Sequence, residues 1–288
     1  MEKYFSWARN MDLQFANFFL NPFYITAVIG VSLASITGSV VSHLVRFTKT
    51  QFLAIESLHM ILAAAATGYL MNLFINYLYP DITAYIIMIL FMIMVSYMIS
   101  RGYEENMSIA TVAFLSAAIA SLASYGLAIY SPIGPSIIYN ILFGSPFFLR
   151  TTDLLISIYM TIIVLGAVLI LWKKILLLSF DPEYFEFLNG SRKTSLYRII
   201  VYILIAVSGI YLTRIVGAVA AHILMIAPSM TPFIKKISVS KSTIIILLIS
   251  LSSVTLSVIA NLPFGGVLGI FALIFYVAPS MIRSVGRH

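Results

Sequence analysis

The chain contains no cysteine and very few charged residues. Of its 288 residues, only 9% are Asp, Glu, Lys or Arg, whereas 61% are hydrophobic. A soluble globular protein carries about 25% charged residues, so this composition indicates a protein that lies mostly in lipid. The absence of cysteine excludes disulfides, thiolate metal sites and thiol redox chemistry. Any metal site must therefore use imidazole, carboxylate, hydroxyl, thioether or backbone oxygen ligands.

Several enzyme motifs are also missing from the sequence. It contains no G-x-x-x-x-G-K-[ST] phosphate loop, no H-E-x-x-H zinc motif and no G-x-S-x-G nucleophile motif. We therefore expect that the chain is not an enzyme, that it does not hydrolyse ATP itself and that it holds no permanent cofactor. The net charge of +7 does not indicate a nucleic-acid partner, because membrane proteins concentrate Lys and Arg in their cytoplasmic loops.

The sequence does contain long apolar runs. A helix needs about 20 mostly apolar residues to cross a bilayer, and such runs predict an all-α polytopic transmembrane bundle of eight or nine spans. The sixth and seventh runs are short and separated only around Arg214, so they form either a hairpin or one broken element. The runs cover residues 23–43, 52–79, 83–100, 108–130, 152–172, 197–213, 216–234, 243–262 and 265–282.

The distribution of basic residues predicts the orientation in the plasma membrane. With nine spans and an outside N-terminus, 13 of the 17 Lys and Arg residues fall on the cytoplasmic side, as the positive-inside rule requires. The C-terminus is then inside. The N-terminal segment lacks a basic region and a small-residue cleavage site, so we expect the first span to be retained. With no internal repeat or linker, residues 1–288 read as one domain.

The longest loop on the predicted cytoplasmic side carries the signals of a short helix near residues 181–190. Asp181-Pro182-Glu183 is a start signal, because Asp caps free N–H groups and Pro fits the first helical position. Asn189-Gly190 is a stop signal. The helix either rests in the lipid headgroups or docks on a soluble partner, and the sequence favours neither. Its apolar residues are Tyr184, Phe185, Phe187 and Leu188.

Glu56 is the carboxylate that falls well inside a membrane-length apolar run, and His59 follows three residues later. Residues at this spacing share a helix face. A charge near the bilayer centre costs about 2.5–3.5 kcal/mol even on lenient insertion scales, so such residues are functional candidates. His222 interrupts another apolar run. Imidazole with carboxylate suits Zn²⁺, Mn²⁺ or Fe²⁺, and the three residues predict a cation site between helices. The competing interpretation is a structural hydrogen bond at Glu56 and core packing of the histidines.

Four stretches of the sequence resemble, in order, the membrane permeases of the ABC-transporter family that imports zinc, manganese and related divalent metals. RFTKTQFLAIESLHMILAA (46–64) resembles the family's helix with an Asp-Ala-Leu-Ser-His motif. NILFGS (140–145) resembles its Leu-Phe-Gly-Ser stretch. FDPEYFEFLNG (180–190) resembles the loop that joins the permease to its ATPase, and GAVAAHILMIAPSMT (217–231) resembles the segment ending in Pro-Ala-Ala-Thr. Aligned on His59, the family's Asp falls at Ile55, so the acid at Glu56 is displaced by one residue.

The resemblance implies the fold and partners of a type II ABC importer. Two copies of the permease form the pathway, an extracytoplasmic metal-binding protein delivers the ion, and cytosolic ATPase subunits drive transport. The transported Zn, Mn or Fe ion binds at Glu56, His59 and His222. The ATPase docking residues are Asp181, Pro182, Glu183, Tyr184, Phe185, Leu188 and Gly190.

Two other functions remain open at this point. The chain is alternatively a stand-alone secondary transporter or channel in which Glu56 and His59 relay protons or cations. It is alternatively an ABC permease for a metal chelate, because the motifs are short and apolar and do not specify the substrate.

Overall fold

The computed structural model describes residues 21–144, 146–230 and 238–277, and every regular element in these ranges is helical. Seven helices are long and apolar enough to cross a membrane. They are α2 (Pro22–Phe47), α3 (Gln51–Phe74), α4 (Pro80–Ser100), α5 (Glu105–Tyr130), α7 (Thr151–Phe180), α9 (Ser191–Val216) and α11 (Val239–Ala260). The shorter helices are α6 (Gly134–Phe143), α8 (Pro182–Asn189), α10 (Ala218–Met230) and α12 (Phe264–Ala272), and two single turns lie at Pro146–Phe148 and Leu273–Val277.

The predicted all-α membrane bundle is confirmed, and each of the nine predicted runs corresponds to a helix. The run 216–234 becomes the short helix α10, and the run 265–282 becomes α12 with a π-helical turn at Leu273–Val277. Residues 231–234 and 278–282 of these runs lie outside the described residues, as does the N-terminal segment 1–20. The short helix α6 was not predicted, because ten residues are too few to register as a span.

A glycine turn divides the predicted sixth and seventh runs into two helices. Gly217 lies between α9 and α10 with a φ of +83°, and Gly144 follows α6 with a φ of +68°. A Cβ atom on Gly217 would lie 2.2 Å from the backbone nitrogen of Gly144. The two turns thus pack backbone against backbone, and only glycine combines this approach with a positive φ. Helices α9 and α10 then pack against each other.

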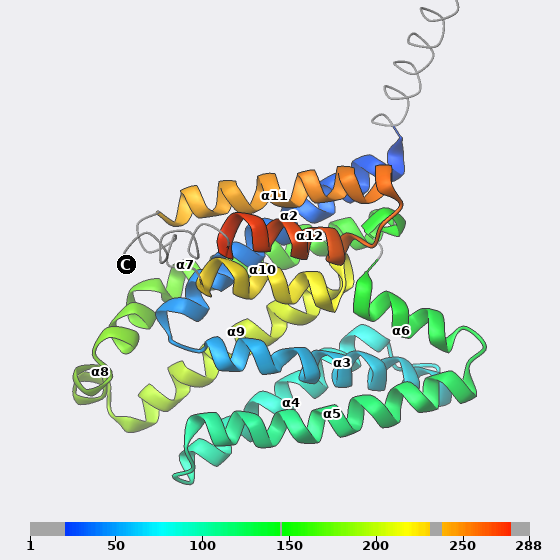
Figure 1. Ribbon diagram of the computed structural model, residues 1–288. Coiled ribbons are helices and arrows are strands. Elements are labelled where there is room, and N and C mark those ends of the chain that lie inside the picture. The colour runs from blue at the N-terminus through cyan, green and yellow to red at the C-terminus, as the bar shows by residue number, and fades with distance from the viewer. Residues whose placement is uncertain (1–20, 145, 231–237, 278–288) are drawn as a thin grey trace, which may run out of the picture.

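Helix α9 lies at the centre of the bundle. In its most apolar stretch, 67% of the residues are buried, compared with 22% in α7, and α9 packs against α2, α3, α4, α7 and α10. Figure 1 shows α11 and α5 at opposite edges, with α2, α10, α9 and α3 between them. Helix α8 lies at one end of the bundle and α6 at the other. We refer to these as the α8 end and the α6 end.

Candidate functional site

Glu56 and His59 lie next to each other on α3, as the spacing predicted. Nδ1 of His59 is 3.4 Å from Oε2 of Glu56. The exposed fraction is 50% for the His59 side chain and 23% for the Glu56 side chain. The pair therefore lies at the edge of the single chain and not in its core. An imidazole and a carboxylate at this separation provide two ligands for a divalent cation, on a face that remains accessible.

His222, the third predicted ligand, lies on α10, and α10 packs directly against α3. The residue is partly buried. In the described part of the chain, however, no three His, Asp or Glu side chains gather closely enough to hold a metal ion. One chain thus supplies a ligand pair on α3 and a nearby histidine on the neighbouring helix.

Helix α8 forms where the start and stop signals predicted it. The side chain of Asp181 accepts a hydrogen bond of 2.9 Å from the backbone N–H of Tyr184. Pro182 begins the helix, and Gly190 ends it with a φ of +80°. The side chains of Tyr184, Phe187 and Leu188 are exposed, whereas Phe185 is buried. The helix therefore presents one aromatic face outward and directs one aromatic ring into the bundle.

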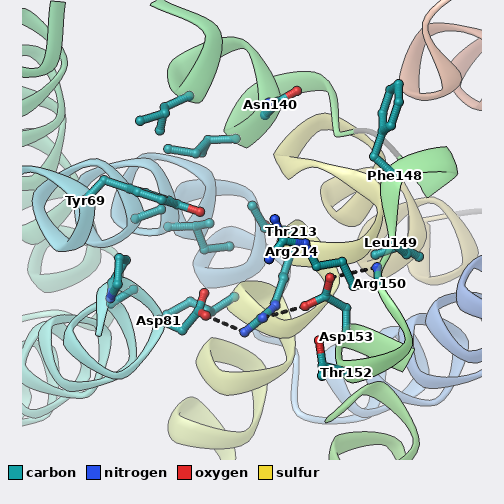
Figure 2. Close-up of a pocket in the computed structure, with 17 residues that line it drawn as sticks. Tyr69, Asp81, Asn140, Phe148, Leu149, Arg150, Thr152, Asp153, Thr213 and Arg214 are labelled. Carbon is teal, nitrogen blue, oxygen red and sulfur yellow. Dashed lines mark hydrogen bonds and ion pairs between the residues drawn. The ribbon is translucent and has the colours of Figure 1, made fainter. Parts of the chain in front are cut away.

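A cavity at the α6 end contains a cluster of ionised side chains that sequence reasoning did not identify as a unit. Its volume is about 520 Å³, and its lining includes residues of α3, α4, α6, α7 and α9. Arg214 of α9 donates one hydrogen bond to Asp81 of α4 and another, of 2.7 Å, to Asp153 of α7. Figure 2 shows the guanidinium of Arg214 between the two carboxylates. We call these three residues the Arg214 triad.

The Arg214 triad joins three helices at a point where each one begins or ends. One guanidinium between two carboxylates offsets half of their negative charge, and charge-assisted hydrogen bonds are about twice as strong as neutral ones. Along α3 the cavity is lined by Tyr69, Ala65 and Ile61, and neither Glu56 nor His59 lines it. The triad thus holds α4, α7 and α9 together beside a cavity that none of the three candidate metal ligands lines.

Comparison with known proteins identifies the family. A model of the ABC 3 transport family matches residues 21–283, which is most of the chain. The chain belongs to the ABC 3 transport family. No curated protein matches the chain in a sequence comparison.

Two solved structures share the fold of this chain. PsaBC from Streptococcus pneumoniae, determined in complex with Fab, has a TM-score of 0.77 and 18% sequence identity. The match covers 92% of this chain and 94% of that one. A transporter described as metal-chelate type, in an inward-facing conformation, has a TM-score of 0.59 and 14% identity over 92% of this chain and 86% of its own.

As a member of the ABC 3 transport family, the chain is a multi-pass membrane protein and the permease subunit of an ABC transporter. The family assignment agrees with the resemblance seen in the four sequence stretches. The Arg214 triad was missed because its residues are far apart in sequence. One signal was available: in the predicted topology, Asp81, Asp153 and Arg214 all fall at span ends on the same side of the membrane.

Proposed function

We propose that this permease carries a divalent metal ion of the zinc, manganese and iron class and that Glu56, His59 and His222 bind it in transit. The observation that carries the proposal is the Glu56–His59 pair in a member of an ABC transport family. Intramembrane ionisable groups are costly and mark ion pathways by default, and borderline cations accept both imidazole and carboxylate ligands. A shift of the acid from the family's position to Glu56 keeps it on the face of His59.

A second copy of the chain completes the site in this proposal. One chain offers a close pair of ligands, and four-coordinate zinc needs further donors. The exposed side of His59 lets a symmetry-related pair approach, because a two-fold interface brings the same surface of both copies together. The pathway then runs between two permease subunits, and each subunit contributes Glu56 and His59.

Helix α8 is the proposed contact with a separate cytosolic ATPase. Its exposed face carries Tyr184, Phe187 and Leu188, and an amphipathic helix of this kind fits a groove on a partner. In this arrangement the α8 end faces the cytoplasm and the α6 end faces outside. An extracytoplasmic metal-binding protein delivers the ion at the α6 end. ATP binding moves the two permease subunits and exposes the Glu56–His59 pairs to each side in turn.

A metal chelate is the second candidate substrate, because the fold is shared with a transporter described as metal-chelate type. The two substrates require different features of the protein. A free ion needs protein ligands, so its transport depends on Glu56 and His59. A chelate brings its own ligands, and its transport depends on the shape of the pathway.

Metal uptake by the complex reconstituted in liposomes tests the proposal. We expect ATP-dependent uptake of the free ion by the wild type and its loss in Glu56→Gln and His59→Ala, with assembly unchanged. Glu104→Gln is the matched control, because Glu104 is exposed at the start of α5. Normal uptake by both variants removes the metal-site assignment. Uptake of the chelate alone supports the second substrate, and uptake by this chain without an ATPase, driven by an ion gradient, supports a stand-alone transporter.

A further inference from the structure

Helix α8 has two faces with different surroundings. Phe187 on the outer face is 85% exposed, whereas Phe185 on the inner face is 1% exposed. A partner subunit that docks from outside contacts the outer face and cannot reach Phe185. The inner face therefore serves a contact within the chain, and its function is separate from docking.

Phe185 packs on Tyr197 of α9. Their ring centroids lie 5.4 Å apart at an interplanar angle of 84°, the edge-to-face arrangement that aromatic pairs prefer. The Nζ atom of Lys174, on α7, donates a hydrogen bond of 2.7 Å to the hydroxyl oxygen of Tyr197. Three helices thus meet at one side chain. We call Phe185, Tyr197 and Lys174 the Tyr197 clasp.

The chain connection between α8 and α9 does not fix their angle by itself. Only Gly190 separates the two helices, and its φ of +80° is a conformation that glycine adopts without strain. No side chain or backbone atom lies within 4 Å of the position that a Cβ atom would occupy there. The Tyr197 clasp supplies a side-chain contact that ties α8 to α9.

Helix α9 leads from the Tyr197 clasp to both helices that carry the candidate metal ligands. Gly209 lies 12 residues after Tyr197, which is about 18 Å along the helix axis. A Cβ atom on Gly209 would lie 2.6 Å from Cδ1 of Ile61 on α3 and 3.7 Å from the sulfur of Met225 on α10. Ile61 is two residues from His59, and Met225 is three residues from His222. Helix α9 is continuous from Ser191 to Val216, so it connects the Tyr197 clasp to these contacts with α3 and α10.

We propose that Tyr197 is the positioning residue that links α8 to α9, so that movement of α8 reaches the Glu56–His59 pair and His222 through α9. The proposal rests on the proposed function, because it assumes that an ATPase moves α8. In this arrangement, helix α8 has two roles on its two faces. The outer face binds the ATPase, and the inner face transmits the movement to the metal site.

The test compares Tyr197→Ala with Tyr197→Phe and with Tyr159→Ala, a control that removes an exposed tyrosine from α7. Tyr197→Phe keeps the ring that contacts Phe185 and loses the hydroxyl that accepts from Lys174. The first readout is the amount of metal transported per ATP hydrolysed by the complete complex. The second is the distance distribution between spin labels at Glu186→Cys on α8 and Lys173→Cys on α7, measured on the purified chain, which has no native cysteine.

We expect Tyr197→Ala to broaden the distance distribution and to lower transport per ATP by about two- to tenfold, the effect of losing one aromatic pair. Tyr197→Phe retains most of both properties, and the ATPase still co-purifies with each variant. If Tyr197→Ala behaves like Tyr159→Ala in either readout, the clasp does not transmit movement and the proposal is wrong. If the wild-type complex carries no metal, the proposed function fails, and the distance distribution alone decides whether the clasp holds α8.

Discussion

At the scale of single residues, ionisable side chains in the bundle lie beside complementary ionisable partners. Arg214 lies between Asp81 and Asp153, and His59 lies beside Glu56. The sequence predicted the second arrangement, because residues three apart on a helix must share a face. It did not predict the first, because three helices must assemble before their ends meet. The local spacing of residues therefore predicted the Glu56–His59 pair but could not predict the Arg214 triad.

Replacing Arg214 with Ala leaves two carboxylates without their shared partner. We expect the free energy of unfolding to fall by about 1.5–3 kcal/mol, the range for hydrogen bonds to charged groups, measured by denaturant titration in detergent micelles. Arg192→Ala is the control, because Arg192 is exposed at the start of α9. A loss no larger than that of the control would mean that the Arg214 triad does not hold α4, α7 and α9 together.

Gly209 is a residue of α9 that lies against both α3 and α10. In Gly209→Ala, the new methyl group meets Ile61 at 2.6 Å, and overpacking of this kind costs about 1–3 kcal/mol. We expect reduced metal uptake together with reduced stability. Gly166→Ala on α7 is the matched control, because no atom lies within 4 Å of its Cβ position, and we expect it to keep wild-type uptake. Equal uptake by the two variants contradicts the role given to the α9–α3 contact.

At the scale of helices, the boundaries depend on glycine turns and on capping residues. The start and stop signals of α8 were visible in the sequence, because Asp181 caps the helix and Gly190 ends it locally. The separation of α9 from α10 was left open, because the positive φ of Gly217 is coupled to the packing of Gly144, more than 70 residues earlier. A sequence pattern reports local conformational preference and does not report such a distant contact.

Because the Gly217 turn packs against the Gly144 turn, we expect a substitution by alanine to cost more stability at Gly217 than at Gly190. We expect Gly217→Ala to lower the free energy of unfolding by about 2–5 kcal/mol, since it combines backbone strain with a steric clash. Gly190→Ala has nearly the same φ but open space around its Cβ position, so only the conformational cost of about 1–3 kcal/mol applies. Denaturation curves of the two variants measure the difference. Equal losses would mean that the backbone contact at Gly144 contributes nothing.

At the scale of the whole molecule, composition and apolar run length predicted the all-α membrane bundle correctly. The apolar run 197–213 predicted α9, but run length did not show that α9 is the most buried of the seven long helices, because burial depends on which helices pack around it. The sequence also placed His222 in the same site as Glu56 and His59. The structure puts α10 beside α3, but a cluster of three such ligands is not formed within the described part of one chain. The proposed second copy supplies the missing ligands.

X-ray absorption of the assembled transporter loaded with Zn²⁺ tests the metal-site proposal most directly. We predict a spectrum with imidazole and carboxylate ligands, a stoichiometry of one bound ion for every two permease chains, and loss of the bound ion in Glu56→Gln but not in Glu104→Gln. The same bound ion and the same spectrum in Glu56→Gln and His59→Ala would contradict the account, because the metal would then bind away from the Glu56–His59 pair.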